Sequence, residues 1–391
     1  MEENFPSGRA AIVAAATYGI GAAPGLSSFD LAAHASIRAL KQVGLTPASV
    51  DGLAVIVMDD SMPVLTFCEY LGIHPRYVDS TRTGGSSFEL HAAAAAHALA
   101  TGRCDVMLIA YGSDQKSAAG KLISSSRPSP WETPYRPLRP ISSYALAAAR
   151  HMHEFGTTKR HLGEVALAAR RWAQLNPEAA MRDPLTMEDY LQARPVADPF
   201  GARDCCLVTD GAAAAVLVRA QDAPALCANA AYVLGGAHET THREIAQMPD
   251  LTRSGTARAA RRAFAQADVT PADIDVVELY DAFTINTILF LEDMGFCARG
   301  AGGAFVADGA IAPGGRLPVN TNGGGLSCVH PGMYGLFTLA EAAQQIMGVC
   351  GERQVANVEL AVAHGNGGEL SSEAVIVLGN ADAAARRRRG R

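Results

Sequence analysis

The feature that most constrains this chain is an internal repeat, whose two copies lie 224 positions apart. Residues 39–51 (ALKQVGLTPASVD) and 263–275 (AFAQADVTPADID) share six identical positions, and most of their apolar positions match. Each copy leads into a segment that is expected to form a buried strand. Such a repeat predicts a chain built from two copies of one structural unit.

A second correspondence supports the duplication. Residues 84–87 (GGSS) precede an expected helix that ends at Ala100 and an expected strand over 106–111. The same order recurs in a glycine loop at 323–325, an amphipathic helix and a strand over 358–364. Because the order and the chemistry of these segments repeat, both halves are expected to share one fold.

The alternation of strands and helices predicts an α/β protein, with parallel strands covered by helices. Apolar strands over 212–218 and 373–378 close the two halves, which are expected to span residues 1–225 and 226–380. The Arg-rich segment 381–391 is expected to be a disordered basic tail.

The first half carries an expected insertion over about residues 113–194, with helices over 141–155 and 159–175. Its first part, 116–140, is a long loop with five basic residues and five prolines. Long loops of this kind are more often functional than accidental. Two interpretations stay open for it, a solvated flap or a binding segment for a phosphate-bearing cofactor or a partner.

Composition excludes several classes of protein. A net charge of −6 gives no reason to expect nucleic-acid binding. The apolar run over 10–16 is too short to span a membrane and lacks the layout of a signal peptide. Eight cysteines without a CxxC pair indicate reduced thiols in a cytoplasmic protein without a structural zinc site.

Three familiar motifs are rejected on their context. Gly19-Ile-Gly21 has Pro24 where a dinucleotide fingerprint needs a third glycine. Residues 238–242 (HETTH) match the zinc-protease pattern, but they follow an expected strand over 231–234, where a loop rather than a helix is expected. Residues 325–329 lack the second glycine of a hydrolase nucleophile elbow.

Polar residues and glycines gather in three segments of the second half. They are 278–283 (ELYDAF), 330–334 (HPGMY) and 364–368 (HGNGG). In a duplicated fold all three fall at ends of core strands or starts of core helices, so they are expected to converge on one pocket.

These three segments resemble motifs of the thiolase superfamily, and within it of the sterol-carrier-protein-type thiolase-like proteins. Residues 280–283 resemble the acidic-aromatic motif of the family, 330–332 its histidine motif and 364–368 its terminal glycine loop. The resemblance covers nearly the whole chain. It implies a five-layer αβαβα sandwich of two similar halves, and a homodimer.

The chain departs from thiolases at the nucleophile. A thiolase needs a cysteine at the start of a helix in the first half, where the helix N-terminus lowers its pKa. No cysteine lies between Cys68 and Cys104, and the second cysteine of the family is also missing. Ser86 or Ser87 could be acylated only beside a strong base. The chain therefore resembles the side-chain-cleaving acyl-CoA aldolases of the lipid-transfer-protein type, which include enzymes of steroid side-chain degradation.

The resemblance implies retro-aldol cleavage of a 3-hydroxyacyl-CoA to a ketone or aldehyde and a short acyl-CoA. Tyr280 and Tyr334 are expected to transfer protons. The sequence does not show which of the two is the base and which is the acid. His330 and the glycine backbone are expected to stabilise the enolate. Asp281 either orients its neighbours or caps a helix. His364 is a weaker catalytic candidate. The residues expected to contact the coenzyme A portion of the substrate are Ser86, Ser87, Gly324, Gly325, Asn366 and Gly367.

No permanently bound cofactor and no metal are expected. The resemblance implies a partner, a small acyl-CoA-binding protein with an OB fold and a zinc ribbon, which could dock on the basic loop. Two alternatives remain: an acyltransferase that uses serine or no covalent intermediate, and a non-catalytic subunit that binds acyl-CoA or lipid.

Overall fold

The computed structural model describes residues 5–118 and 130–389, so Lys121 and Arg127 of the expected basic loop lie outside the described residues. No helix in those two ranges has the length and the apolar character that a membrane span requires. The strands are β1 (Ala10–Gly21), β2 (Gly52–Ile56), β3 (Tyr77–Asp79), β4 (Val106–Ser113), β5 (Pro195–Ala197), β6 (Phe200–Gly201), β7 (Asp210–Arg219), β8 (Ala231–Thr240), β9 (Val276–Glu278), β10 (Leu360–Gly367) and β11 (Ser372–Gly379). The α-helices are α1 (Ser28–Gln42), α2 (Pro63–Leu71), α3 (Ser87–Ala100), α4 (Ile141–Phe155), α5 (Lys159–Gln174), α6 (Met187–Leu191), α7 (Ala223–Leu226), α8 (Thr256–Ala267), α9 (Thr284–Met294), α10 (Gly302–Val306), α11 (Gly335–Met347) and α12 (Ala381–Arg389).

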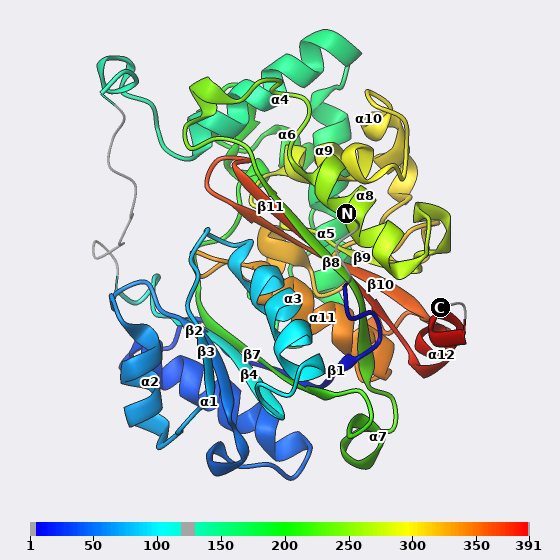
Figure 1. Cartoon of the computed structure of the whole chain (residues 1–391). Helices are drawn as coiled ribbons and strands as arrows, with labels where there is room; N and C mark the ends of the chain where they lie inside the picture. The colour runs from blue at the N-terminus through cyan, green and yellow to red at the C-terminus, as the bar shows by residue number, and fades with distance from the viewer. Residues whose placement is uncertain (1–4, 119–129, 390–391) are drawn as a thin grey trace.

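Nine strands form one hydrogen-bonded sheet in the order β3-β2-β4-β7-β1-β8-β11-β10-β9. The first five belong to the first half of the chain and the last four to the second. The two groups meet where β1 pairs with β8 through two residue pairs, Ala11 with Tyr232 and Ile12 with Ala231. This short junction lets the sheet fold over, so that its two halves enclose a layer of helices (Figure 1).

The predicted duplication is confirmed in the topology. In the first half, β2 runs parallel to both β3 and β4. In the second half, β9 runs parallel to β10, and a single parallel bridge joins Val277 to Val319 on its other side. Val319 thus occupies the place of β3. The repeated Thr-Pro-Ala segments form matching 3-10 turns, Pro47–Ser49 and Pro271–Asp273, each just before the corresponding strand.

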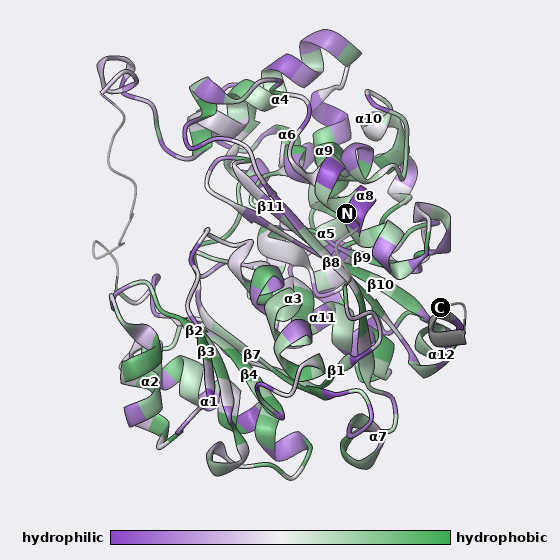
Figure 2. Ribbon diagram, viewed as in Figure 1, coloured by the Kyte–Doolittle hydropathy of each residue, from purple (hydrophilic) through white to green (hydrophobic). Residues whose placement is uncertain are grey.

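The five-layer αβαβα order is also confirmed. Helices α3 and α11 pack against each other and against strands of both sheet halves, so they form the central layer. Helix α1 covers the outer face of the first half, and α8 covers the outer face of the second. Because these central helices lie between the two sheet halves, most of their residues are buried, and many of these are alanine or large apolar residues. Figure 2 shows the same concentration of hydrophobic residues in the strands and central helices.

The insertion contains α4 and α5, which agree with the predicted helices to within one residue. In the described part of the basic loop, Arg139 is not free for a ligand. Its guanidinium forms ion pairs with Glu132 and Glu244, and lies 3.9 Å from Glu369. Lys116 and Arg136 are exposed in this loop, and so are the large apolar side chains Trp131, Tyr135 and Leu138.

Two expectations are wrong. Residues 381–389 are not a disordered tail but the helix α12, because Ala383 and Ala384 are buried and Asn380 accepts a hydrogen bond from the Ala383 N–H at 2.9 Å. No loop begins after Leu234, since β8 continues to Thr240 by pairing with β11. Residues 238–240 of the HETTH segment are therefore strand, and the helix that a zinc-protease motif requires does not form.

Candidate active site

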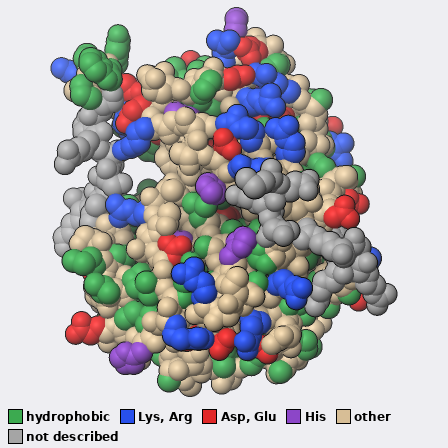
Figure 3. Space-filling view, viewed as in Figure 1, with side chains coloured by type: hydrophobic (Ala, Val, Ile, Leu, Met, Phe, Trp, Pro, Cys, Tyr) green, Lys and Arg blue, Asp and Glu red, His purple; other side chains and the backbone are tan. Residues whose placement is uncertain are grey.

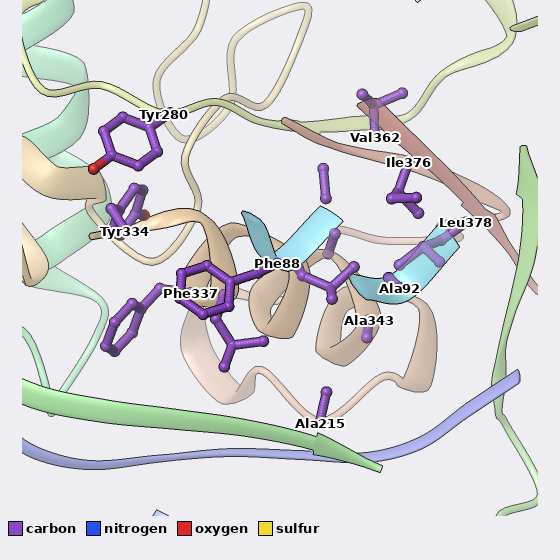
Figure 4. Close-up of a cluster of buried hydrophobic side chains, with 14 of the residues drawn as sticks. Phe88, Ala92, Ala215, Tyr280, Tyr334, Phe337, Ala343, Val362, Ile376 and Leu378 are labelled. Atoms are coloured by element: carbon purple, nitrogen blue, oxygen red, sulfur yellow. The ribbon is translucent and has the colours of Figure 1, made fainter. Parts of the chain in front are cut away.

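Three of the predicted catalytic residues meet between the two halves of the fold. Tyr280 follows β9, while His330 and Tyr334 lie in the segment that leads into α11. The ring of Tyr280 stands edge-on to His330 and to Tyr334, with centroids 5.5 and 5.8 Å apart. Figure 4 shows the two tyrosines side by side, next to Phe337. The sequence prediction that the first two polar segments converge is confirmed.

These three side chains are almost enclosed. Tyr334 is completely buried, and Tyr280 and His330 keep 5% and 8% of their surface exposed. Burial raises the pKa of both tyrosines well above the usual range and lowers the pKa of His330 to about 4. At neutral pH the site therefore holds two phenols and a neutral imidazole. The Nε2 atom of His330 is buried without a hydrogen-bond partner among the described residues.

Asn322 fixes the hydroxyl of Tyr334. The Tyr334 hydroxyl donates to the Asn322 Oδ1 atom at 2.8 Å, and the same oxygen accepts the Gly324 N–H at 2.7 Å. Asn322 therefore ties the tyrosine to the glycine loop. The carboxyl groups of Asp281 and Glu278 add to the effect of burial on the pKa of Tyr334.

Asp281 orients the glycine loop, whose residues Gly324–Cys328 form a π-helical turn, and it does not cap α9. Its Oδ1 atom accepts the Gly325 N–H at 2.6 Å, and its Oδ2 atom accepts the Leu326 N–H at 3.4 Å. The residue at the N-cap of α9 is Phe283. The carboxyl lies so close to the loop that a Cβ atom at Gly324, which has a φ of +66°, would come within 2.0 Å of it.

The expected role of the loop backbone in holding an enolate is therefore wrong for two N–H groups. Those of Gly324 and Gly325 already donate to Asn322 and Asp281. The Nε2 atom of His330, beside the tyrosines, is one of the buried polar atoms without a hydrogen-bond partner among the described residues. Sequence reasoning could not anticipate this, because loop sequence does not show which N–H groups bond internally.

The start of α3 is closed to a nucleophile. An ideal Cβ atom at Gly85 would stand 1.9 Å from a ring carbon of Tyr280. The hydroxyls of Ser86 and Ser87 are buried and bonded internally: Ser86 Oγ to Ser372 at 3.0 Å, and Ser87 Oγ to the Gly84 carbonyl at 2.6 Å. The expected contacts of these serines with coenzyme A are therefore not supported.

The third polar segment divides between two faces of β10. His364 points toward the outer helices, where its Nε2 atom lies 3.0 Å from Thr256 Oγ1 and 3.1 Å from Glu373. Gly365, the next residue, faces α3, where a Cβ atom would meet the carboxyl of Glu89. The prediction that His364 shares the pocket is wrong, because successive strand residues face opposite sides.

Asn366 and Gly367 are both buried. The Asn366 amide donates to the hydroxyl of Tyr144 at 2.7 Å, and Tyr144 in α4 stacks on Phe283 at 4.5 Å. Gly367 packs on the carbonyl of Thr83, which leaves no room for a side chain. The Asn366 carbonyl lies above Gly85 next to the Tyr280 ring, so this part of the third segment reaches the site. Any contact of either residue with coenzyme A remains a prediction.

Two residues near the site escaped sequence reasoning. Tyr111 in β4 bonds to the segment that carries His330, and Glu89 in α3 is completely buried with its Oε1 atom accepting the Thr338 hydroxyl at 2.9 Å. Burial raises the pKa of Glu89 to about 8. For Glu89 the sequence does carry a signal, because a charged residue inside an alanine-rich helix is unusual. For Tyr111 it carries none, because tyrosines are common in apolar strands.

Comparison with known proteins places this geometry in a family. The model of the thiolase C-terminal domain-like family matches residues 237–380. The chain is 33% identical to 17-hydroxy-3-oxo-4-pregnene-20-carboxyl-CoA lyase of Mycobacterium tuberculosis, over 88% of this chain and 92% of the relative. It is 34% identical to acetyl-CoA acetyltransferase of Methanothermobacter thermautotrophicus, over 89% of this chain and 94% of that relative.

A solved structure gives the same answer for the fold. The Ltp2-ChsH2(DUF35) aldolase superposes on this chain with a TM-score of 0.88 and 29% identity, over 96% of this chain and 98% of that one. The duplicated five-layer fold, the closed nucleophile position and these relatives agree. The chain belongs to the thiolase superfamily, as a sterol-carrier-protein-type thiolase-like protein that lacks the catalytic cysteine.

Proposed function

We propose that this protein is a carbon–carbon lyase that cleaves a 3-hydroxyacyl-CoA, with a steroid or similar side chain, by a retro-aldol reaction. The observation that carries the proposal is the ring of Tyr280, which fills the space above Gly85 at the start of α3. A retro-aldol reaction needs no covalent intermediate, so it is compatible with a closed nucleophile position. The names of the tuberculosis lyase and of the Ltp2-ChsH2 aldolase support the same reaction class.

In the proposed reaction, a base removes the proton of the 3-hydroxyl group. The C2–C3 bond then breaks, a carbonyl forms at C3, and the electron pair moves into the thioester enolate. An acid finally protonates C2, which yields the short acyl-CoA. Proton transfers by positioned side chains of this kind contribute about 10²–10⁴ in rate.

Tyr280 suits the role of base and Tyr334 that of acid. Burial and the neighbouring Tyr144, Cys206 and Tyr111 raise the pKa of Tyr280, and the Tyr334 backbone N–H opposes them. Asp281 and Glu278 instead disfavour a phenolate at Tyr334. The neutral imidazole of His330, with its proton on Nε2, would donate to the enolate oxygen.

The experiment compares the wild type with Tyr280→Phe and Tyr334→Phe, each assayed with candidate 3-hydroxyacyl-CoA substrates. We expect a ketone or aldehyde product from the wild type and a loss of about 10²–10⁴ in kcat in each variant. The exposed Tyr70, whose hydroxyl bonds to Asp30, provides the control variant Tyr70→Phe, with unchanged kcat. Full cleavage by both folded site variants would refute the assigned roles.

An acyltransferase is the second candidate, because of the 34% identity to the archaeal acetyltransferase. It predicts a stable acyl-enzyme with release of coenzyme A, which mass spectrometry of the protein after incubation with acetyl-CoA would detect. Binding of acyl-CoA without turnover on a panel of substrates would instead indicate a non-catalytic subunit.

For partners, we propose a homodimer and a small acyl-CoA-binding protein with an OB fold and a zinc ribbon. The Ltp2-ChsH2 aldolase, whose name joins two proteins, supports the second partner. The surface around α2 and β3 supports the homodimer. Its apolar side chains Met62, Leu65 and Val78 are all more than half exposed and line a hollow of about 520 Å³.

The same surface has a free strand edge. In the nine-stranded sheet, β3 is terminal and pairs with β2 on one side. A second copy of the chain, related by a two-fold axis, could pair its own β3 against this edge and cover the apolar residues. Figure 3 shows hydrophobic side chains exposed over α2 at the lower left.

A further inference from the structure

The turn between His330 and Tyr334 is held by a residue from the other half of the protein. Tyr111 lies in β4, and its hydroxyl donates to the Pro331 carbonyl and accepts the Met333 N–H at 3.2 Å. These two backbone groups flank Gly332, whose φ of +88° makes the turn. One hydroxyl thus closes the turn that connects two proposed reacting groups.

The hydroxyl of Tyr111 has both of its hydrogen-bonding capacities in use. The side chain is completely buried, and burial raises its pKa, so it remains a phenol at neutral pH. Removing the oxygen would leave the Pro331 carbonyl and the Met333 N–H without their partner in a buried place. On the other side of the turn, Gln115 Oε1 lies 2.7 Å from the position of a Cβ atom at Gly332.

His330 leads directly into this turn, and its imidazole also hydrogen-bonds its own backbone. Its Nε2 atom has no hydrogen-bond partner among the described residues, so no bond at that atom holds the imidazole. Its backbone is fixed instead, since the His330 N–H donates to Thr209 Oγ1 at 3.0 Å. Tyr334, by contrast, has its hydroxyl fixed by Asn322. A looser turn would therefore displace the imidazole relative to the tyrosine.

We propose that Tyr111 is a positioning residue, which sets the placement of the His330 imidazole relative to Tyr334 through the turn at Gly332. The expected change in kcat rests on the proposed lyase function. The expected displacement of the His330 imidazole does not. Displacing a reacting group by about 1 Å can cost about 10²-fold in rate. Substrate binding depends less on this geometry than the chemical step does, so kcat should change more than KM.

The test is Tyr111→Phe, with Tyr190→Phe as the matched control. Tyr190 is also a buried tyrosine, and its hydroxyl donates to Asp204 instead of to the turn. Two readouts are recorded for the whole protein: kcat and KM of cleavage, and the NMR signal of the His330 imidazole, assigned by its loss in His330→Asn. The NMR readout needs no turnover, so it separates a failure of this inference from a failure of the proposed function.

We expect Tyr111→Phe to lower kcat by about 10–100-fold with little change in KM, and to shift or broaden the His330 signal. Tyr190→Phe should keep both values. An unchanged kcat and an unchanged signal in Tyr111→Phe would overturn the inference, and so would equal losses of kcat in the two variants. If Tyr111→Phe does not fold, Gly332→Ala strains the same turn, because Gly332 has a φ of +88° and its Cβ atom would lie 2.7 Å from Gln115 Oε1, and the His330 signal must again move.

Discussion

The ring of Tyr280 lies against the Cα atom of Gly85, at the start of the helix where a thiolase carries its nucleophile. A Cβ atom at Gly85 would stand 1.9 Å from one ring carbon and 2.6 Å from another. Any side chain at position 85 must therefore displace the tyrosine. The absence of a cysteine at this helix start and the placement of Tyr280 are therefore compatible with each other, and Tyr280 is the residue that we propose for proton transfer.

Gly85→Cys should therefore not produce a thiolase. We expect the added side chain to cost about 1–3 kcal/mol of stability through overpacking and to abolish cleavage by displacing Tyr280. Ala100→Cys places the same thiol at the exposed end of α3 and should leave stability and activity unchanged. Thermal melts, cleavage assays and mass spectrometry for an acyl-enzyme check these outcomes. A stable Gly85→Cys protein that acylates from acetyl-CoA would contradict the prediction.

Much of the fold could be predicted because it is encoded twice. The repeated segments 39–51 and 263–275 identify equivalent turns and strands, and the structure confirms both. The wrong predictions are those that depend on long-range pairing. Strand β8 continues beyond Leu234 because β11 lies beside it, and a sequence of small and polar residues does not show that.

The site was predictable in its residues more than in its contacts. The pattern of polar residues at the ends of core strands and starts of core helices singles out the segments of Tyr280, His330 and Tyr334, and the resemblance to the thiolase superfamily assigns their roles. His364 was misplaced, since the direction of a strand residue depends on register, and one position separates the two faces. The contribution of Tyr111 could not be foreseen, because a hydroxyl in an apolar strand has no sequence signal of its partner.

Stability should depend on pH through Asp281. Burial raises the pKa of this carboxyl to about 7, whereas an unfolded chain leaves it near the ordinary value of about 4. Between pH 5 and pH 7 the folded state holds a proton that the unfolded state lacks, so stability falls as the pH rises. Over two pH units this group accounts for about 3 kcal/mol.

Asp281→Asn removes that titration. We expect the stability of the variant, relative to the wild type, to rise by about 3 kcal/mol from pH 5 to pH 7. Asp60→Asn is the control, because hydrogen bonds from Thr66 and Met62 lower the pKa of Asp60 and it stays ionised throughout this window. Urea denaturation at several pH values gives the comparison. Parallel pH profiles of Asp281→Asn and the wild type would show that Asp281 does not titrate as described.

The two histidines should differ in function. His330→Asn removes the unpaired Nε2 group beside the tyrosines, and we expect kcat to fall by about 10²–10³-fold with little loss of stability. His364→Gln lies on the outer face of β10 and removes the imidazole whose Nε2 atom lies 3.1 Å from the buried carboxyl of Glu373 and 3.0 Å from Thr256 Oγ1. It should cost about 1–3 kcal/mol of stability and keep the activity per folded molecule. A folded but inactive His364→Gln protein would place that histidine in the site after all.

The apolar surface at α2 and β3 should decide the oligomeric state. Leu65 and Val78 are 65% and 51% exposed in the single chain, next to the free edge of β3. In a two-fold dimer both subunits contribute the same surface, so each residue occurs twice in the interface. Leu65→Glu and Val78→Glu would therefore each place two unpaired charges there, at a cost of several kcal/mol. We expect these variants to be monomers by sedimentation at concentrations where the wild type is a dimer. Leu146→Glu, at a similarly exposed leucine in α4, should leave the dimer intact. A wild-type monomer, or a dimer that survives both substitutions, would exclude this surface as the interface.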